Sequence, residues 1–225
     1  EWSPDDQPET NIEQAARDTR YQFFEQVMVT EDIDYLVTAH HQDDQVETIL
    51  MRLFEGKNVE LLTGIPEISS RFNKRIIRPL LPFAKDELYA YAKKYKLVFF
   101  EDETNFEDIY YRNFIRTQII PPLKENNHKF NEHLIAFKKE LEELLEIREL
   151  QLVQLHHLKT VEADYQVLDY QELMEYPKSI QRAFIQEILQ DFYLQTESDL
   201  KNTYIDLFFE LMTSESVNKT IEFGQ

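Results

Sequence analysis

Apolar positions in the first half of the chain follow two alternating periodicities. Helical spacing predicts amphipathic helices over residues 11–30, 43–54 and 84–95. Short β-prone runs lie between or after these helices, at residues 35–38, 75–78 and 97–100. Strands that alternate with helices usually form a parallel sheet with helices on its faces. The first half is therefore predicted to be an α/β domain with a partial doubly wound parallel sheet.

The second half shows helical spacing almost throughout. Leucine and phenylalanine recur along residues 130–158, and two more helical segments are predicted at 179–193 and 199–212. A weak β-prone run lies near the end, at 220–223. We therefore expect two domains that meet near the proline pair 121–122, an α/β part over residues 1–124 and an all-α part over residues 125–225.

Composition restricts the function of these 225 residues. The chain has 43 acidic and 24 basic residues and a net charge of -19, the opposite of most nucleic-acid-binding proteins, so any contact with nucleic acid must be local. The absence of cysteine excludes disulfides, thiolate metal sites and thiol nucleophiles, and agrees with a reducing cytoplasm. No apolar run approaches the roughly 20 residues that span a bilayer, so no membrane association is expected.

Polar residues with catalytic potential gather where the first predicted strand meets the next helix. His40 and His41 are followed by Asp43, Asp44 and Glu47, at the edge of an α/β sheet where ligands usually bind. Asp44 and Glu47 share a helix face and could hold an ammonium group or a metal ion. Two alternatives stay open here. The acids could simply cap the helix, with both histidines on the surface, or the cluster could be a metal-hydrolase site.

A basic stretch interrupts the acidic chain. Residues 71–85 contain no acidic residue, and their basic side chains have Phe72 and Phe83 among them. Such a cluster could contact nucleic-acid phosphates through salt-dependent interactions. The alternative is that these residues flank a buried strand. The candidate contacts are Arg71, Lys74, Arg75 and Arg78.

Four segments together resemble one enzyme family. LVTAHHQDDQVETILMRLFEG resembles the second signature of the tRNA(Ile)-lysidine synthetase family, a group of PP-loop ATP-pyrophosphatases. The further segments are NIEQAARDTRYQFF, IIRPLLPFAKDEL and EDETNFEDIYYRNFIRTQIIPPL. The resemblance covers residues 11–124 and implies a sheet of the adenine nucleotide alpha-hydrolase type, with residues 1–124 as the C-terminal part of the PP-loop catalytic domain. Residues 125–225 match only as a helical domain in the corresponding place, and the resemblance implies that this domain contacts tRNA.

This resemblance implies an ATP-dependent ligase of the translation apparatus. Members use ATP, with Mg²⁺, to adenylate the C2 oxygen of the wobble cytidine of tRNA(Ile), and the ε-amine of free L-lysine then displaces AMP to form lysidine. By the same resemblance, Asp44 and Glu47 hold the lysine ammonium groups, and His40 or His41 is the catalytic-site histidine. The R-N-x-x-R stretch is matched by Arg112, Asn113 and Arg116. Arg112 and Arg116, four residues apart, are expected to share a helix face and reach an anionic adenylate.

One family motif has no counterpart in the chain. Members open with an S-G-G-x-D-S loop that cradles the ATP phosphates, whereas this chain has only three glycines, and they are far apart. We therefore expect this loop on an upstream strand, and no ATP-dependent turnover by this chain alone. A non-catalytic tRNA-binding fragment and another PP-loop tRNA-modifying enzyme remain alternatives. A homodimer also stays open.

Overall fold

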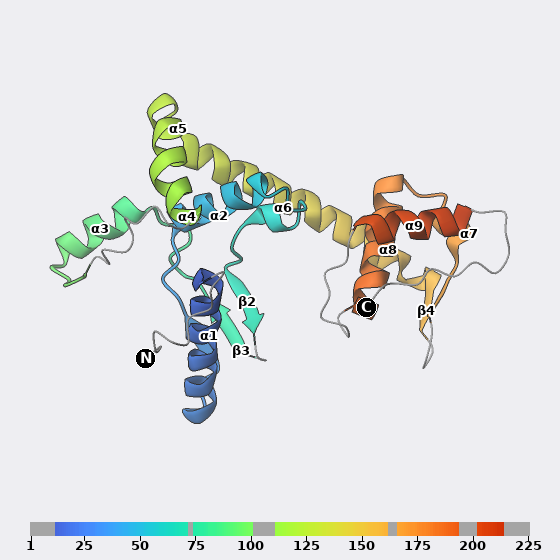
Figure 1. The fold of residues 1–225 in the computed structure, drawn as a ribbon, viewed down its shortest axis with the longest axis horizontal. Helices are drawn as coiled ribbons and strands as arrows, with labels where there is room; N and C mark the ends of the chain where they lie inside the picture. Colours follow the sequence, from blue (N-terminus) through green and yellow to red (C-terminus); the bar gives the residue numbers. More distant parts are fainter. Residues whose placement is uncertain (1–11, 72–73, 101–110, 162–165, 194–201, 214–225) are drawn as a thin grey trace. The chain divides into compact units, whose positions relative to one another are not determined.

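The computed structural model describes residues 12–71, 74–100, 111–161, 166–193 and 202–213 (Figure 1). By spatial contacts the chain divides into two compact units, Glu1–Glu142 and Glu143–Gln225. This division falls later than residue 124 because the start of helix α6 (Phe130–Leu155) packs on the first unit. Within the described ranges, no helix is long and apolar enough to cross a bilayer.

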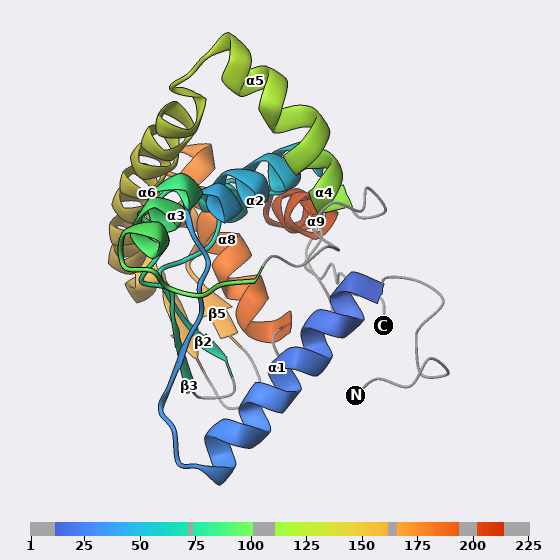
Figure 2. The same cartoon turned by 90° about the vertical axis from the view of Figure 1, so that its left-hand side faces the viewer.

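The first unit contains a small mixed sheet in the order β1-β3-β2. Figure 2 labels two of its strands, β2 and β3. Strand β1 (Tyr35–Val37) runs parallel to β3 (Lys74–Ile77), whereas β2 (Ile68–Arg71) pairs with β3 in the antiparallel direction. The predicted parallel pairing is therefore confirmed for β1 and β3 only. The expectation of a wholly parallel sheet is wrong for the described strands, because β2 and β3 follow each other as antiparallel neighbours.

Three predicted helices of the first half are confirmed. They are α1 (Ile12–Thr30), α2 (Gln42–Phe54) and α3 (Lys85–Lys94). Helix α1 packs on the sheet, since its buried Tyr21 and Met28 line a small cavity together with Leu36 and Ile76.

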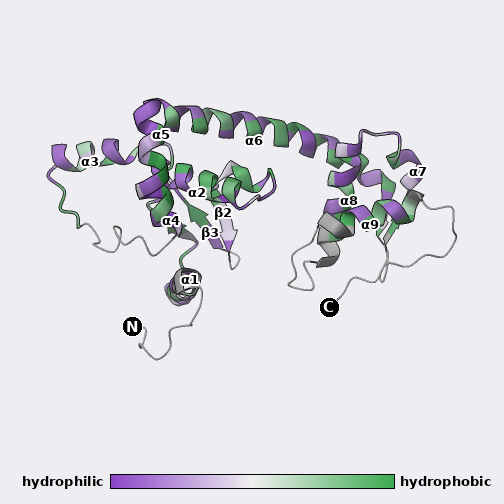
Figure 3. Cartoon of the chain, turned by 45° about the horizontal axis from the view of Figure 1, so that its top comes forward, coloured by the Kyte–Doolittle hydropathy of each residue, from purple (hydrophilic) through white to green (hydrophobic). Residues whose placement is uncertain are grey.

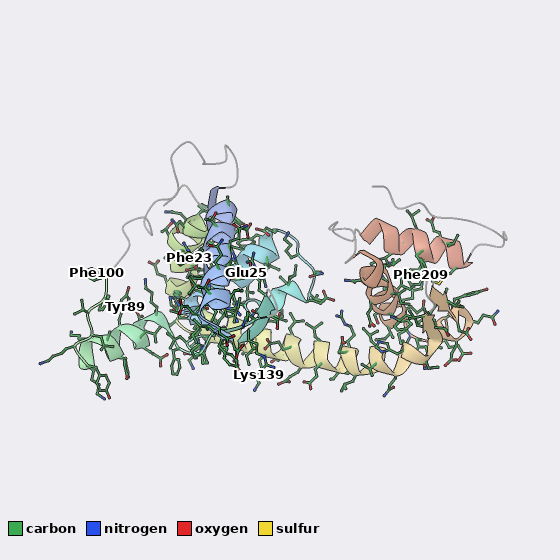
Figure 4. The ribbon with its side chains drawn as sticks, turned by 90° about the horizontal axis from the view of Figure 1, so that it is seen from below. Phe23, Glu25, Tyr89, Phe100, Lys139 and Phe209 are labelled. Carbon is green, nitrogen blue, oxygen red and sulfur yellow. The ribbon has the colours of Figure 1, made fainter. Side chains whose placement is uncertain are left out.

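The β-prone run at residues 97–100 does not form a strand. These residues follow α3 as coil, and the side chains of Val98 and Phe100 are 86% and 93% exposed. Figure 4 labels Phe100 on this segment, beyond α3. A strand requires a neighbour that satisfies its backbone hydrogen bonds, and this segment pairs with none of the described strands.

A bent helix follows in the first unit, and it includes the stretch in which Arg112 and Arg116 were expected to share a helix face. It comprises α4 (Tyr111–Phe114), a π-helical segment (Ile115–Ile119) and α5 (Ile120–Asn126). Pro121 and Pro122 have no backbone N–H and cannot continue the ordinary α-helical ladder. The N–H of Ile120 instead bonds to the carbonyl of Ile115, five residues earlier. Such π-helical segments occur frequently at functional sites.

The core of the first unit joins this bent helix to α2. Val46 and Leu50 of α2 pack with Ile115 and Ile120, and both Val46 and Ile115 are fully buried. Partly buried apolar residues at the start of α6 pack against the same cluster, namely Phe130, Leu134 and Ile135. This packing fixes the backbone of Glu47, which follows Val46, close to that of Arg116, which follows Ile115.

The second unit is built on helices, as predicted, but is not wholly helical. The predicted helices correspond to α6, α8 (Lys178–Tyr193) and α9 (Asn202–Thr213), and a short helix α7 (Tyr170–Leu173) is added. Apolar and polar positions alternate along α6 in Figure 3. Strands β4 (Lys159–Val161) and β5 (Gln166–Leu168) form an antiparallel pair, so the all-α expectation is not confirmed. The β-prone run 220–223 lies outside the described residues.

Gly64 fixes a loop against α2. Its φ is +77°, and a Cβ at this position would collide with the side-chain amide of Gln45, which bonds both backbone groups of Ile65. We expect Gly64→Ala to lower the free energy of unfolding by about 2–3 kcal/mol, from overpacking and backbone strain together. Gly56 also has a positive φ, +65°, but open space around it, so Gly56→Ala should cost only about 1 kcal/mol. Urea unfolding of both variants is the test, and equal losses would contradict a steric role for Gly64.

Candidate functional site

The candidate residues of the first half meet at the carboxyl edge of the parallel strand pair. His40 and His41 follow β1, and Arg78 follows β3 directly. The backbone N–H of Thr38 bonds to the carbonyl of Ile77 at 3.0 Å, which joins the two strand ends. Helix α2 begins at Gln42, so its N-terminus and first-turn acids lie at this same edge.

A buried carboxylate organises two arginines at this edge. The side chain of Glu47 is 3% exposed. Arg112 Nε donates to its Oε2 at 3.1 Å, and Arg116 donates to both oxygens, from Nε at 2.6 Å and from Nη2 at 2.9 Å. These Glu47 hydrogen bonds are the main cause that raises the pKa of Arg116. The two guanidinium groups of the R-N-x-x-R stretch therefore converge on one carboxylate.

Asp44 is placed differently from Glu47. Its Oδ2 accepts the backbone N–H of His41 at 3.0 Å, and its Oδ1 lies 4.0 Å from Arg116 Nη2. The side chain is 16% exposed. Asp44 thus contributes to the helix cap from the first turn, whereas the capping alternative assigned the cap to Asp43, and it also borders the arginine pair.

Asp43 does not cap α2, because the N-cap is His41. The Asp43 carboxylate instead accepts the backbone N–H of Lys85 at 2.8 Å and the ammonium of Lys124 at 3.1 Å. Asn131 of α6 donates to it as well, at 3.3 Å. Asp43 therefore ties the start of α2 to α3, α5 and α6, away from the arginine pair.

The two histidines are not equivalent. Nδ1 of His40 lies 2.8 Å from the hydroxyl of Thr38, which orients the ring. Burial lowers the pKa of His40, the Asp44 carboxylate partly opposes this, and the positive charges of Arg78 and Arg112 lower it further. The lowered pKa favours the neutral form of the His40 imidazole. His41 is the helix N-cap, with Nδ1 3.5 Å from Asp44.

The basic stretch divides into a buried and a surface part. Arg78 is 6% exposed, and its Nη1 donates to the carbonyl of Pro66 at 2.8 Å and to Ser69 Oγ at 3.0 Å. The position of Arg78 thus agrees with the alternative interpretation, in which the basic residues flank a buried strand. Arg75 is exposed on β3.

Arg71 and Lys74 lie on the surface next to acidic side chains. They form a cross-strand pair in β2 and β3. Arg71 pairs with Asp18 at 3.2 Å and lies over the Tyr21 ring, and Lys74 lies 3.4 Å from Asp34. Their side chains are partly exposed, and the neighbouring carboxylates already balance part of their charge.

Two polar residues at the site, Thr38 and Thr48, were not predicted as site residues. Thr48 accepts Arg112 Nη2 at 3.0 Å, and Thr38 contacts His40 as described above. Only the spacing of Thr38 two residues before His40 could have suggested such a contact. Asn113, which was predicted, is 7% exposed, between the two arginines in sequence. Among the described residues, no three His, Asp or Glu side chains are grouped so as to hold a metal ion.

Comparison with known proteins agrees with the geometry of this edge. The family model described as a PP-loop domain matches residues 1–123, more than half of the chain. The chain belongs to the PP-loop domain family. Membership implies the adenine nucleotide alpha-hydrolase fold, of which the parallel pair β1 and β3 and the helices around it are described here.

Individual relatives of this PP-loop chain share one name. The tRNA(Ile)-lysidine synthase of Enterococcus faecalis is 44% identical over 136 residues, which cover 60% of this chain and 29% of the relative. The proteins of the same name from Staphylococcus aureus and Bacillus cereus are each 34% identical, over 81% and 95% of this chain and 43% and 45% of their own lengths. These relatives confirm the predicted family resemblance. The chain spans less than half the length of each.

Asp43 makes the stability of the first unit depend on pH. Burial would raise the pKa of its carboxyl, but the hydrogen bonds from Lys85 and Lys124 outweigh burial and lower the pKa. A lowered folded-state pKa contributes stability above the unfolded value of about 3.9, and this stability is lost as the pH falls through the folded-state pKa. We expect Asp43→Asn to cost about 1–2 kcal/mol at neutral pH, since Lys124 is partly exposed, and progressively less in acid. Urea unfolding at neutral and acidic pH is the test. If the difference in the free energy of unfolding between the wild type and Asp43→Asn did not change with pH, this role of Asp43 would be contradicted.

Proposed function

We propose that the full-length protein is a tRNA(Ile)-lysidine synthase, which uses ATP to join free L-lysine to C2 of the wobble cytidine of tRNA(Ile). The observation that carries this proposal is the convergence of Arg112 and Arg116 on Glu47 and beside Asp44, at the ligand-binding edge of a PP-loop domain. The shared name of the relatives supports the substrate. The reaction would take place in the cytoplasm, where a chain without cysteine needs no oxidising compartment.

Asp44 is proposed to receive an ammonium group of lysine. A buried ammonium requires acceptors for its N–H groups, and a carboxylate supplies both acceptors and the opposite charge. One Asp44 oxygen binds the backbone of His41, and the other lies toward the arginines. Lysine would thus be held at the N-terminus of α2, next to the site of attack.

His40 is proposed to accept the proton of the attacking amine. Only a neutral amine has the lone pair that forms the new bond to C2, so the ε-ammonium must first lose a proton. A neutral imidazole can take it, and the Thr38 hydroxyl fixes the ring. The amine then bonds to C2, the bond between C2 and the adenylated oxygen breaks, and AMP leaves with the electron pair of that bond.

Arg112 and Arg116 are proposed to bind the phosphate of the adenylated cytidine. Guanidinium groups form strong charge-assisted hydrogen bonds to phosphate oxygens. As AMP leaves, negative charge grows on its phosphate, and fixed cations stabilise that charge most in the transition state.

ATP and Mg²⁺ follow from the PP-loop family rather than from a site in the described residues. Within these residues no group of three acidic or histidine side chains could hold the ion. We therefore propose that Mg²⁺ enters with the ATP phosphates.

The surface strands are proposed to contact tRNA through Arg71, Lys74 and Arg75. Arg75 is the most available of these three because the other two already pair with acids. On duplex DNA each phosphate contact contributes about 0.9 to the log–log salt slope. We expect Arg75→Ala to weaken tRNA binding at low salt and to reduce this slope by about 0.7–0.9. A salt titration of tRNA affinity is the measurement, with Arg182→Ala on α8 as a matched surface-arginine control. An unchanged salt slope for Arg75→Ala would show that Arg75 on β3 does not contact tRNA.

The direct test of the proposed function is incorporation of labelled lysine into tRNA(Ile) by the purified full-length protein. Incorporation should require ATP and release one AMP for each lysine joined. A tRNA-binding protein without turnover would bind tRNA(Ile) in this assay but incorporate no lysine.

A further inference from the structure

Glu47 has surroundings that differ from those of a substrate ligand. Its carboxylate accepts three hydrogen bonds from two guanidinium groups, and these bonds occupy both oxygens. We propose that Glu47 is a positioning residue, which holds Arg112 and Arg116 together as one receptor for the phosphate of the adenylate and does not itself bind lysine. This inference rests on the proposed function, and it reassigns Glu47 from the lysine-binding role that the family resemblance implies.

Access to Glu47 argues against a lysine ligand. Its side chain is 3% exposed, whereas the side chains of Arg112 and Arg116 are 24% and 31% exposed. An incoming molecule would therefore meet the guanidinium groups before the carboxylate. An ammonium group would also be repelled by these two cations. Asp44, at 16% exposure and with one guanidinium 4.0 Å away, offers the more open carboxylate.

Charge balance gives Glu47 its positioning role. Two guanidinium groups side by side repel each other, most strongly where water is excluded. One carboxylate between them offsets this repulsion, and the Asp44 carboxylate, 4.0 Å from Arg116 Nη2, offsets more of it. The fork of each guanidinium suits the oxygens of a phosphate.

The helices that carry these groups are locked together next to the ion pairs. Val46, the residue before Glu47, and Ile115, the residue before Arg116, are both fully buried in one apolar cluster. The π-helical segment begins at Ile115. Arg112 is further fixed by the bond from its Nη2 to Thr48. The backbone positions are thus set by packing, and Glu47 sets the directions of the side chains.

The kinetic test compares Glu47→Gln with Asp44→Asn in the full-length protein. If Glu47 positions the arginines, Glu47→Gln should lower kcat by about 100-fold and leave the lysine KM within about threefold of the wild type. Asp44→Asn should mainly raise the lysine KM. Glu47→Asp keeps the charge and should recover part of kcat. A lysine KM that rises as much in Glu47→Gln as in Asp44→Asn, with kcat retained, would overturn the proposal.

A second measurement does not depend on ligase activity. In the ¹⁵N-labelled protein, the Nε–H signals of Arg112 and Arg116, assigned with Arg112→Lys and Arg116→Lys, should be protected from exchange with water. Both signals should lose protection in Glu47→Gln, and AMP should bind about tenfold more weakly. Should Glu47→Gln fail to fold, Glu47→Asp carries the same comparison. Protected signals and unchanged AMP binding in the variants would overturn the proposal. Loss of protection and of AMP binding in a protein that forms no lysidine would overturn the proposed function alone.

Discussion

Replacing Arg116 with alanine in the full-length protein is expected to reduce kcat by about 100- to 1000-fold, with little change in the lysine KM or in tRNA affinity. Arg116 donates to both oxygens of Glu47 and approaches Asp44, so its loss removes a phosphate donor and leaves a buried carboxylate with one partner. Breaking a buried ion pair costs about 3–5 kcal/mol, which we reduce to about 2–3 kcal/mol because Arg116 is partly exposed. Steady-state kinetics and urea unfolding measure the two effects separately.

Arg116→Lys is the matched control for this loss. It keeps one positive charge near Glu47 but cannot bond both carboxylate oxygens in the planar geometry of a guanidinium. Its stability should lie close to that of the wild type, while kcat should remain at least about tenfold lower. Full activity in Arg116→Lys would mean that only charge, and not the paired geometry, matters at this position.

Asp44→Asn is expected to raise the lysine KM by about 100-fold while the ATP KM stays within about threefold of the wild type. The substitution removes the negative charge that receives the ammonium but keeps an oxygen that can accept the backbone N–H of His41. The helix cap should therefore survive, and the loss should appear in lysine binding. Steady-state titration of each substrate is the measurement.

The adjacent acid provides the control for Asp44. Asp43 faces Lys85 and Lys124 rather than the arginine pair, so Asp43→Asn should lower stability without a specific change in the lysine KM. Equal increases of the lysine KM in both variants would show that the net charge of the region, and not a particular carboxylate, attracts lysine. If Asp44→Asn raised the KM values of ATP and lysine equally, Asp44 would be assigned to nucleotide binding.

The spacing of apolar residues along the sequence predicted three helices and two strands of the first unit. Helices α1, α2 and α3 carry apolar stripes at helical spacing, and β1 and β3 are short runs between them that contain β-prone apolar residues. Residues 97–100 have equal β-propensity but no described partner strand, and propensity alone does not make a strand. Strand β2 escaped prediction because its two serines give a weak apolar signal.

The arrangement of the site depended on contacts that sequence spacing does not show. Arg112 and Glu47 are 65 residues apart, and their contact follows from the packing of Ile115 on Val46. The proline pair was interpreted as a domain boundary, whereas it lies within a helix whose ladder shifts at the π-helical segment.

Arg78 is buried, although the charge pattern of the sequence grouped it with the candidate phosphate contacts. It was grouped with the surface bases because no acid occurs near it in sequence. Strand alternation would have placed it on the same face as Ile76, which is buried. Its neighbours in space, Pro66 and Ser69, accept hydrogen bonds from its Nη1, whereas its buried Nε has no hydrogen-bond partner among the described residues.

Nucleoside analysis of tRNA(Ile) after incubation with the full-length protein, ATP and lysine measures the proposed reaction itself. We expect the wobble cytidine to gain one lysine through C2, product formation to require both ATP and lysine, and a transcript with uridine at this position to stay unmodified. An unmodified wobble cytidine in tRNA(Ile) that the protein demonstrably binds, or a product that contains no lysine, would show that the protein is not a tRNA(Ile)-lysidine synthase.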